Sequence, residues 1–152
     1  MNPENIQDLY TLTPTQRAIL FHTLYAPETG VYVEQNAVEI HDLDVACFIQ
    51  AWQQVIQRHA ALRTAFFWEE VEEPLQVVAK ELSLPLTQLD WRGLDDTQQM
   101  TQLEDLMAAE RQQGFALSVP PLFRLYLMQL DENRHFFSSI SIIFCMTAGL
   151  IL

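Results

Sequence analysis

The segment PPLFRLYLMQL, residues 120–130, alternates two sets of side chains, and both sets are largely apolar. A strand that is apolar on both faces must be covered on both, which favours a central place in its sheet. The turn DENR then leads into HFFSSISIIF, residues 135–144, which predicts a second strand paired with the first. One face of the first strand would carry Leu122, Arg124, Tyr126 and Met128, and the other Phe123, Leu125, Leu127 and Gln129.

Three segments have the residue spacing of amphipathic helices: 14–26, 44–59 and 95–114. The first begins with a capping-box pattern, in which Thr13 is the N-cap and Gln16 lies three residues later. The second helix can be capped by Asp42 or Asp44 and the third by Asp95 or Asp96, and the third is stopped by a glycine.

Runs rich in β-branched and aromatic residues predict the remaining strands. One strand is expected over about 31–41. LRTAFFWEE, residues 62–70, predicts another, with PLQVVAKE, residues 74–81, as its hairpin partner across an acidic turn. Together with the helices, these strands predict an α+β fold in which helices pack on a mixed, mainly antiparallel sheet.

Composition limits the classes of function. The chain has 152 residues, which suits one domain, and its 49% of apolar residues predicts a packed core. The net charge of -12 opposes binding to nucleic acid and to anionic membranes. No secretory leader is recognised, so the chain is expected in the cytoplasm with reduced thiols.

The sequence contains no complete catalytic or metal-binding set. Cys47 and Cys145 lie far apart, without a partner at metal-ligand spacing. The serines of 138–141 lack the glycine-flanked elbow that presents a nucleophile. Three histidines have no base or nucleophile partner at motif spacing, so structural roles are expected for His22, His41 and His135.

Two motifs nevertheless carry a specific pattern. RHAALRTAFF, residues 58–67, contains the pattern Arg-His-x-x-Leu-Arg-Thr-x-Phe. Taken alone, its cations are expected to have a structural role, because cations at a helix C-terminus interact favourably with the helix dipole. An earlier motif has Pro14, Gln16 and an apolar run around Leu20. Together with PPLFRLYLMQLDENRHFF, these motifs resemble the opening of a condensation domain from a nonribosomal peptide synthetase, over about residues 6–137. The positions that match the first pattern are Arg58, His59, Leu62, Arg63, Thr64 and Phe66.

The resemblance implies a fold, an activity and partners. Members of this family resemble chloramphenicol acetyltransferase, with two lobes across a tunnel, and this chain would be the N-terminal half-domain. The implied activity is amide-bond formation between acyl groups on phosphopantetheine arms, with no metal or cofactor bound directly. The implied partners are peptidyl carrier domains and adjacent synthetase domains. The family signature is His-His-x-x-x-Asp-Gly, and the resemblance implies that Arg63 holds its Asp.

That signature is absent where the resemblance places it, because residues 141–150 are SIIFCMTAGL. No catalytic residue is therefore assigned, and the chain is expected to be inactive alone. Among the codons that the genetic code allows, ATC ATA TTT TGC ATG ACG GCT GGT CTN can encode residues 142–150. After a preceding C, the frame one base earlier spells His-His-Ile-Leu-His-Asp-Gly-Trp-Ser. We hypothesise a frameshift between about 135 and 141, which would make 138–152 an aberrant tail of a partial condensation domain at 1–152.

Other interpretations of the tail stay open. Residues 136–152 could be a buried strand with a frayed end, or a membrane anchor at the lower edge of the roughly 17–25 residues that span a bilayer. The alternative functions are a noncatalytic carrier-docking module and a small α+β protein with a membrane tail. If a second lobe is missing, Phe123, Leu125 or the tail should expose apolar surface.

Overall fold

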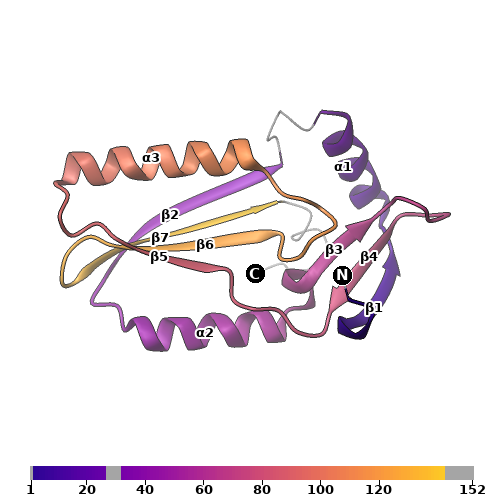
Figure 1. The fold of residues 1–152 in the computed structure, drawn as a ribbon, viewed down its shortest axis with the longest axis horizontal. Helices are drawn as coiled ribbons and strands as arrows, with labels where there is room; N and C mark the ends of the chain where they lie inside the picture. Colours follow the sequence, from indigo (N-terminus) through magenta and orange to yellow (C-terminus); the bar gives the residue numbers. More distant parts are fainter. Residues whose placement is uncertain (1, 27–31, 143–152) are drawn as a thin grey trace.

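The computed structural model describes residues 2–26 and 32–142, and Figure 1 shows how they are arranged. The helices in these ranges are α1 (Pro14–Tyr25), α2 (Val45–Arg58) and α3 (Asp96–Gln113). The strands are β1 (Ile6–Thr11), β2 (Val33–His41), β3 (Thr64–Phe67), β4 (Leu75–Ala79), β5 (Leu86–Asp90), β6 (Phe123–Gln129) and β7 (Arg134–Ile142). Two short 3-10 helices, η1 (Pro3–Asn5) and η3 (Ala60–Arg63), precede β1 and β3.

The strands form two sheets, one with the order β1-β4-β3 and one with the order β2-β7-β6-β5. Neighbouring strands are antiparallel except β5 and β6, which are parallel. The predicted α+β class with a mainly antiparallel sheet is therefore confirmed. Both expected hairpins, β3–β4 and β6–β7, are present, and β6 is an internal strand as its apolar faces predict.

Helices cover both faces of the four-stranded sheet, with α3 on one side and α2 on the other (Figure 1). Tyr126 and Met128 of β6 pack with residues of α3, including Leu103. Phe123 and Leu125, on the opposite face, pack against α2 and are only 3% and 1% exposed. The expectation that a missing second lobe would leave these two residues exposed is wrong, because α2 covers them.

The helix starts follow the capping residues in the sequence. Thr13 N donates to Gln16 Oε1 at 2.8 Å, and Gln16 N donates to Thr13 Oγ1 at 3.3 Å, so the capping box is complete. Asp44 caps α2 by accepting a backbone N–H of the first turn. Asp95, rather than the next residue, caps α3 and forms a second capping box with Gln98.

Two strands and one boundary differ from the sequence-based expectation. β1 has a register shift between Ile6 and Asp8, which interrupts the alternation that would have identified it. β5 is a short edge strand whose pairing with β6 is remote in the sequence. The strand expected from Leu62 starts only at Thr64, because Leu62 and Arg63 belong to η3.

No helix in the described ranges is long and apolar enough to cross a membrane. The first part of the segment considered as an anchor, residues 136–142, lies in β7 and pairs with β2 and β6. Residues 143–152 lie outside the described residues. They include Cys145 and most of the run that the frameshift hypothesis concerns.

Candidate functional site

Arg63 occupies the junction between α2, η3 and the end of β4. Its side chain is 5% exposed, and all three guanidinium nitrogens donate hydrogen bonds. The bonds reach two carbonyls in the last turn of α2, two at the end of β4 and one side chain beside β4. The acceptors are Ile56 O (3.0 Å), Gln57 O (3.3 Å), Lys80 O (3.3 Å), Gln7 Oε1 (2.8 Å) and Ala79 O.

The electrostatic balance of this junction depends on carbonyl oxygens. A buried cation needs compensating partners, most often a carboxylate. No carboxylate in the described residues bonds to Arg63; the last carbonyls of α2, at the negative end of its helix dipole, point at the guanidinium instead. Arg63 therefore clamps the end of α2 to the three-stranded sheet. Its implied contact with the signature Asp stays a prediction.

The other residues of this motif surround the clamp. Arg58 is the exposed last residue of α2, and the backbone N–H of His59 caps the helix by donating to Val55 O at 3.0 Å. Leu62 packs beside the α2 cluster. Two members are buried on β3: Thr64, whose Oγ1 donates to Ala60 O at 2.9 Å, and Phe66, which is fully buried.

The opening motif contacts β4 near its first residues, whereas Arg63 contacts its last residue. Pro14 starts α1, and the fully buried Gln16 donates through Nε2 to Gln76 Oε1 of β4 at 3.2 Å. Leu20 is buried in a cluster that also contains Phe66. The two motifs, far apart in the sequence, are thus joined through β4 and one apolar cluster.

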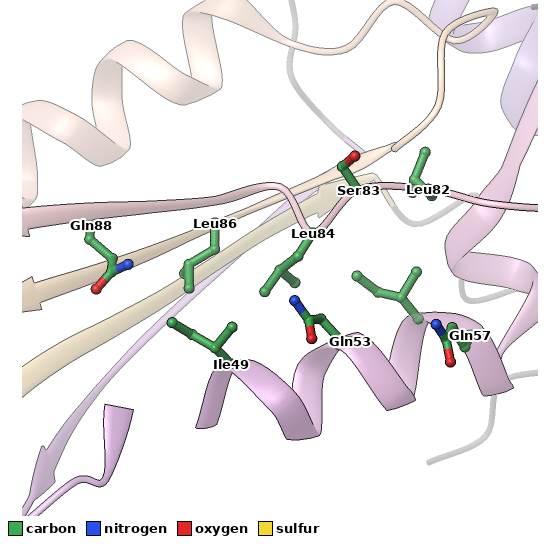
Figure 2. A pocket seen from close by; sticks show the side chains of 9 residues that line it. Ile49, Gln53, Gln57, Leu82, Ser83, Leu84, Leu86 and Gln88 are labelled. Atoms are coloured by element: carbon green, nitrogen blue, oxygen red, sulfur yellow. The ribbon is translucent and has the colours of Figure 1, made fainter. Parts of the chain in front are cut away.

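A groove runs along α2 from this junction towards β5. It consists of two adjoining cavities of about 460 and 730 Å³, both lined by Ile56 and Gln57 of α2. In Figure 2, Leu84 and Leu86 face α2 across the first cavity, and Gln53 faces them from the helix. The first cavity has no charged residue in its lining, whereas the second is lined by Arg63, Lys80 and Glu81.

The described residues do not assemble a catalytic or metal centre. In these ranges, no group of three His, Cys, Asp or Glu side chains could hold a metal ion. His22 makes an edge contact with the Tyr32 ring, and His41 lies 3.3 Å from Glu39. His135 is buried, and its Nδ1 has no hydrogen-bond partner in the described structure. These contacts agree with structural roles and supply no nucleophile and base pair.

One buried polar network was not identified from the sequence. Glu110 of α3 is 6% exposed, accepts a hydrogen bond from Tyr126 Oη at 2.6 Å, and forms a short ion pair with Arg124 Nε. Burial and the bond to Glu110 raise the pKa of Tyr126 to about 12. The available signal was an Arg and a Tyr on one face of an otherwise apolar strand, which predicts a buried acceptor opposite them.

Comparison with known structures identifies the fold of this site. The starter condensation domain of rhizomide synthetase RzmA matches 91% of this chain with a TM-score of 0.76 at 22% identity, and the match covers 34% of that domain. The four-domain nonribosomal peptide synthetase holo-AB3403 matches 92% of the chain with a TM-score of 0.76 at 15% identity, over 10% of its length. The fold is that of the chloramphenicol acetyltransferase-like condensation domains.

Sequence comparison gives the family. The condensation-domain family model matches residues 6–139. A linear gramicidin synthase of Brevibacillus parabrevis is 42% identical over 134 residues, and malpinin synthetase of Mortierella alpina is 36% identical over 133 residues. These matches cover 88% and 86% of this chain but 2% of each synthetase. The chain belongs to the condensation-domain family of nonribosomal peptide synthetases and spans a small part of its relatives.

We expect Arg63→Ala to lower the free energy of unfolding by about 3 kcal/mol, because it leaves buried carbonyls of α2 and β4 without a donor. Urea denaturation monitored by circular dichroism measures this change. Arg58→Ala is the matched control from the same motif, since Arg58 is exposed, and should cost less than about 1 kcal/mol. Equal effects of the two substitutions would contradict the clamp.

The pKa of Tyr126 predicts a change in stability at alkaline pH. Its folded-state value of about 12 lies above the ordinary value near 10. The stabilisation is therefore complete below about pH 10 and is lost as the pH rises towards 12. Relative to Tyr126→Phe, the wild-type chain should lose stability over this range in urea titrations, whereas exposed Tyr10→Phe should follow the wild type. Parallel pH profiles of the wild type and Tyr126→Phe would contradict a contribution of the raised Tyr126 pKa to stability.

Proposed function

We propose that this chain is the first lobe of an amide-forming condensation domain, and that it contributes shape and substrate positioning. The observation that carries the proposal is the family match over 6–139, together with the folding of its two most specific motifs into one junction around Arg63 and β4. The described residues contain no nucleophile and base pair, which fits a positioning role.

The proposed reaction joins two acyl groups that arrive on phosphopantetheine arms. The amine of one group attacks the thioester carbonyl of the other, so that a C–N bond forms and a C–S bond breaks. The amine loses a proton, and the departing thiolate gains one. The proposed partners are peptidyl carrier domains and neighbouring synthetase domains, in the cytoplasm. The names of the relatives, which include gramicidin and tyrocidine synthases, support a synthetase context.

The closing run of the chain is interpreted within the same proposal. We propose that the codons for residues 142–150 preserve the family signature one base out of frame. The support is the genetic code itself: every amino acid from His-His to Trp-Ser is available through allowed third positions. On this interpretation, the parent gene encodes the second lobe in the shifted frame.

The nucleotide sequence tests this frame directly. Sequencing the gene from the codon of Phe137 onward should show CATCAT in the shifted frame, followed by codons for Asp-Gly and an open frame that continues as a second lobe. A shifted frame with stop codons, or without the paired histidines, would eliminate the frameshift.

The isolated chain should form no amide product. The assay mixes it with two carrier domains, one bearing an aminoacyl thioester and one bearing an acyl thioester, and intact-protein mass spectrometry follows transfer. A complete two-lobe condensation domain that accepts the same substrates provides the positive control. We expect the chain to match the protein-free control, because it spans 34% of the RzmA starter condensation domain and its sequence contains no paired histidines of the signature. Product that increases with the amount of chain would contradict this expectation.

A further inference from the structure

A cavity of about 450 Å³ lies where β6 begins, separate from the groove along α2. Its walls come from the segment that follows α3, from the proline that precedes β5 and from the first residues of β6. Val119, which is 61% exposed, lies in this lining. The polar side chains of the lining are Gln113 and Arg124. The apolar wall residues are Pro85, Phe115, Ala116, Val119, Pro120, Pro121 and Phe123.

Arg124 is held rigidly in this wall. Its Nε pairs with the carboxylate of Glu110, and its Nη2 donates to Gly114 O at 2.8 Å. One face of the guanidinium stacks on the Phe115 ring, with Cζ 4.1 Å from the ring centroid. Glu110 is itself fixed by Tyr126. These contacts set the position of the guanidinium in advance, so a ligand would not have to order it.

The remaining nitrogen of Arg124 has hydrogen-bonding capacity left. Nη1 carries two N–H donors. In the described structure none of the hydrogen bonds of Arg124 uses Nη1, and the side chain is 23% exposed, while its partner Glu110 is buried. The cavity therefore combines mostly apolar walls with the preorganised donor group of Arg124 and the amide of Gln113. A mainly apolar lining with a few polar groups is the usual composition of a small-molecule site.

The charges select the class of ligand. Glu110 neutralises Arg124, and no other charged residue lines the cavity. A free anion would meet a neutral ion pair in a chain with a net charge of -12, so an uncharged acceptor suits the site better. A carbonyl oxygen attached to an apolar group would satisfy both Nη1 and the apolar walls.

We propose that this cavity binds an uncharged apolar acyl or amide group, with its carbonyl oxygen accepting a hydrogen bond from Arg124 Nη1. The cavity lies at the end of the sheet where β7 finishes, since Ile142 N donates to Leu122 O at 3.2 Å beside it. The identification of the ligand as an acyl substrate rests on the proposed function. The existence of the binding site is argued from the cavity and Arg124 alone, independently of that function.

The test uses N-acetyl-leucine amide as the probe, titrated into the ¹⁵N- and methyl-labelled chain and followed by NMR. We expect saturable shifts at the Val119 methyls and the Arg124 side-chain N–H, with a dissociation constant in the low millimolar range, as suits about a dozen non-hydrogen atoms. Val119→Asp should weaken binding at least tenfold. Val71→Asp, at the tip of the β3–β4 hairpin and also exposed, should leave it unchanged.

Three results would overturn the proposal: no saturable shift with the wild-type chain, equal binding by Val119→Asp, or tighter binding of the carboxylate N-acetyl-leucine than of the amide. The last would show that the site prefers an anion. None of these measurements involves condensation chemistry, so failure of the site and failure of the proposed function are distinguishable.

Discussion

The buried guanidinium of Arg63 is the polar contact that bonds the end of α2, which covers the four-stranded sheet, to the other sheet. It faces the last carbonyls of α2 and the last carbonyls of β4, and its cost of burial is offset by these hydrogen bonds rather than by a carboxylate. Because α2 covers one face of the four-stranded sheet while β4 is the central strand of the other sheet, this contact couples the two parts of the core. Without it, no other described polar side chain bonds the end of α2 to β4.

The functional surfaces follow from that coupling. The groove along α2 ends at Arg63, so the clamp fixes one end of its wall. On the other face of the sheet, Glu110 performs a comparable role by joining α3 to β6 through Arg124 and Tyr126. A buried charged group thus ties α2 to the three-stranded sheet and another ties α3 to the four-stranded sheet. Arg63 lines the groove and Arg124 lines the cavity at the start of β6, so each of these two surfaces includes a member of one tie.

Much of this fold could be predicted from local patterns. The caps at Thr13, Asp44 and Asp95 and the doubly apolar strand β6 identified the helices and the sheet centre, because caps and alternation act within a few residues. β5 was missed because its pairing is remote in the sequence. The Glu110 network was missed for the same reason, since no local pattern indicates which acceptor a strand Arg will meet.

The role of Arg63 shows the limit of motif reasoning. Its place in the pattern identified the family, and the family model confirms that assignment, yet the pattern did not indicate that the guanidinium would bind main-chain carbonyls. Every residue has a main-chain carbonyl, so the sequence does not indicate which of them will accept a hydrogen bond from a side chain. The extended strand expected at Leu62 likewise gave way to η3, a turn that places Arg63 against α2.

Native-state hydrogen exchange on Arg63→Lys tests the coupling most directly. Lysine keeps the charge but cannot reach α2 and β4 together with a planar fork of donors. The account predicts that the amides of His59 and Lys80, which close α2 and follow β4, lose protection together, while amides in α3 such as Leu103 keep theirs. Unchanged exchange at His59 and Lys80, or an equal loss across α3, would contradict it.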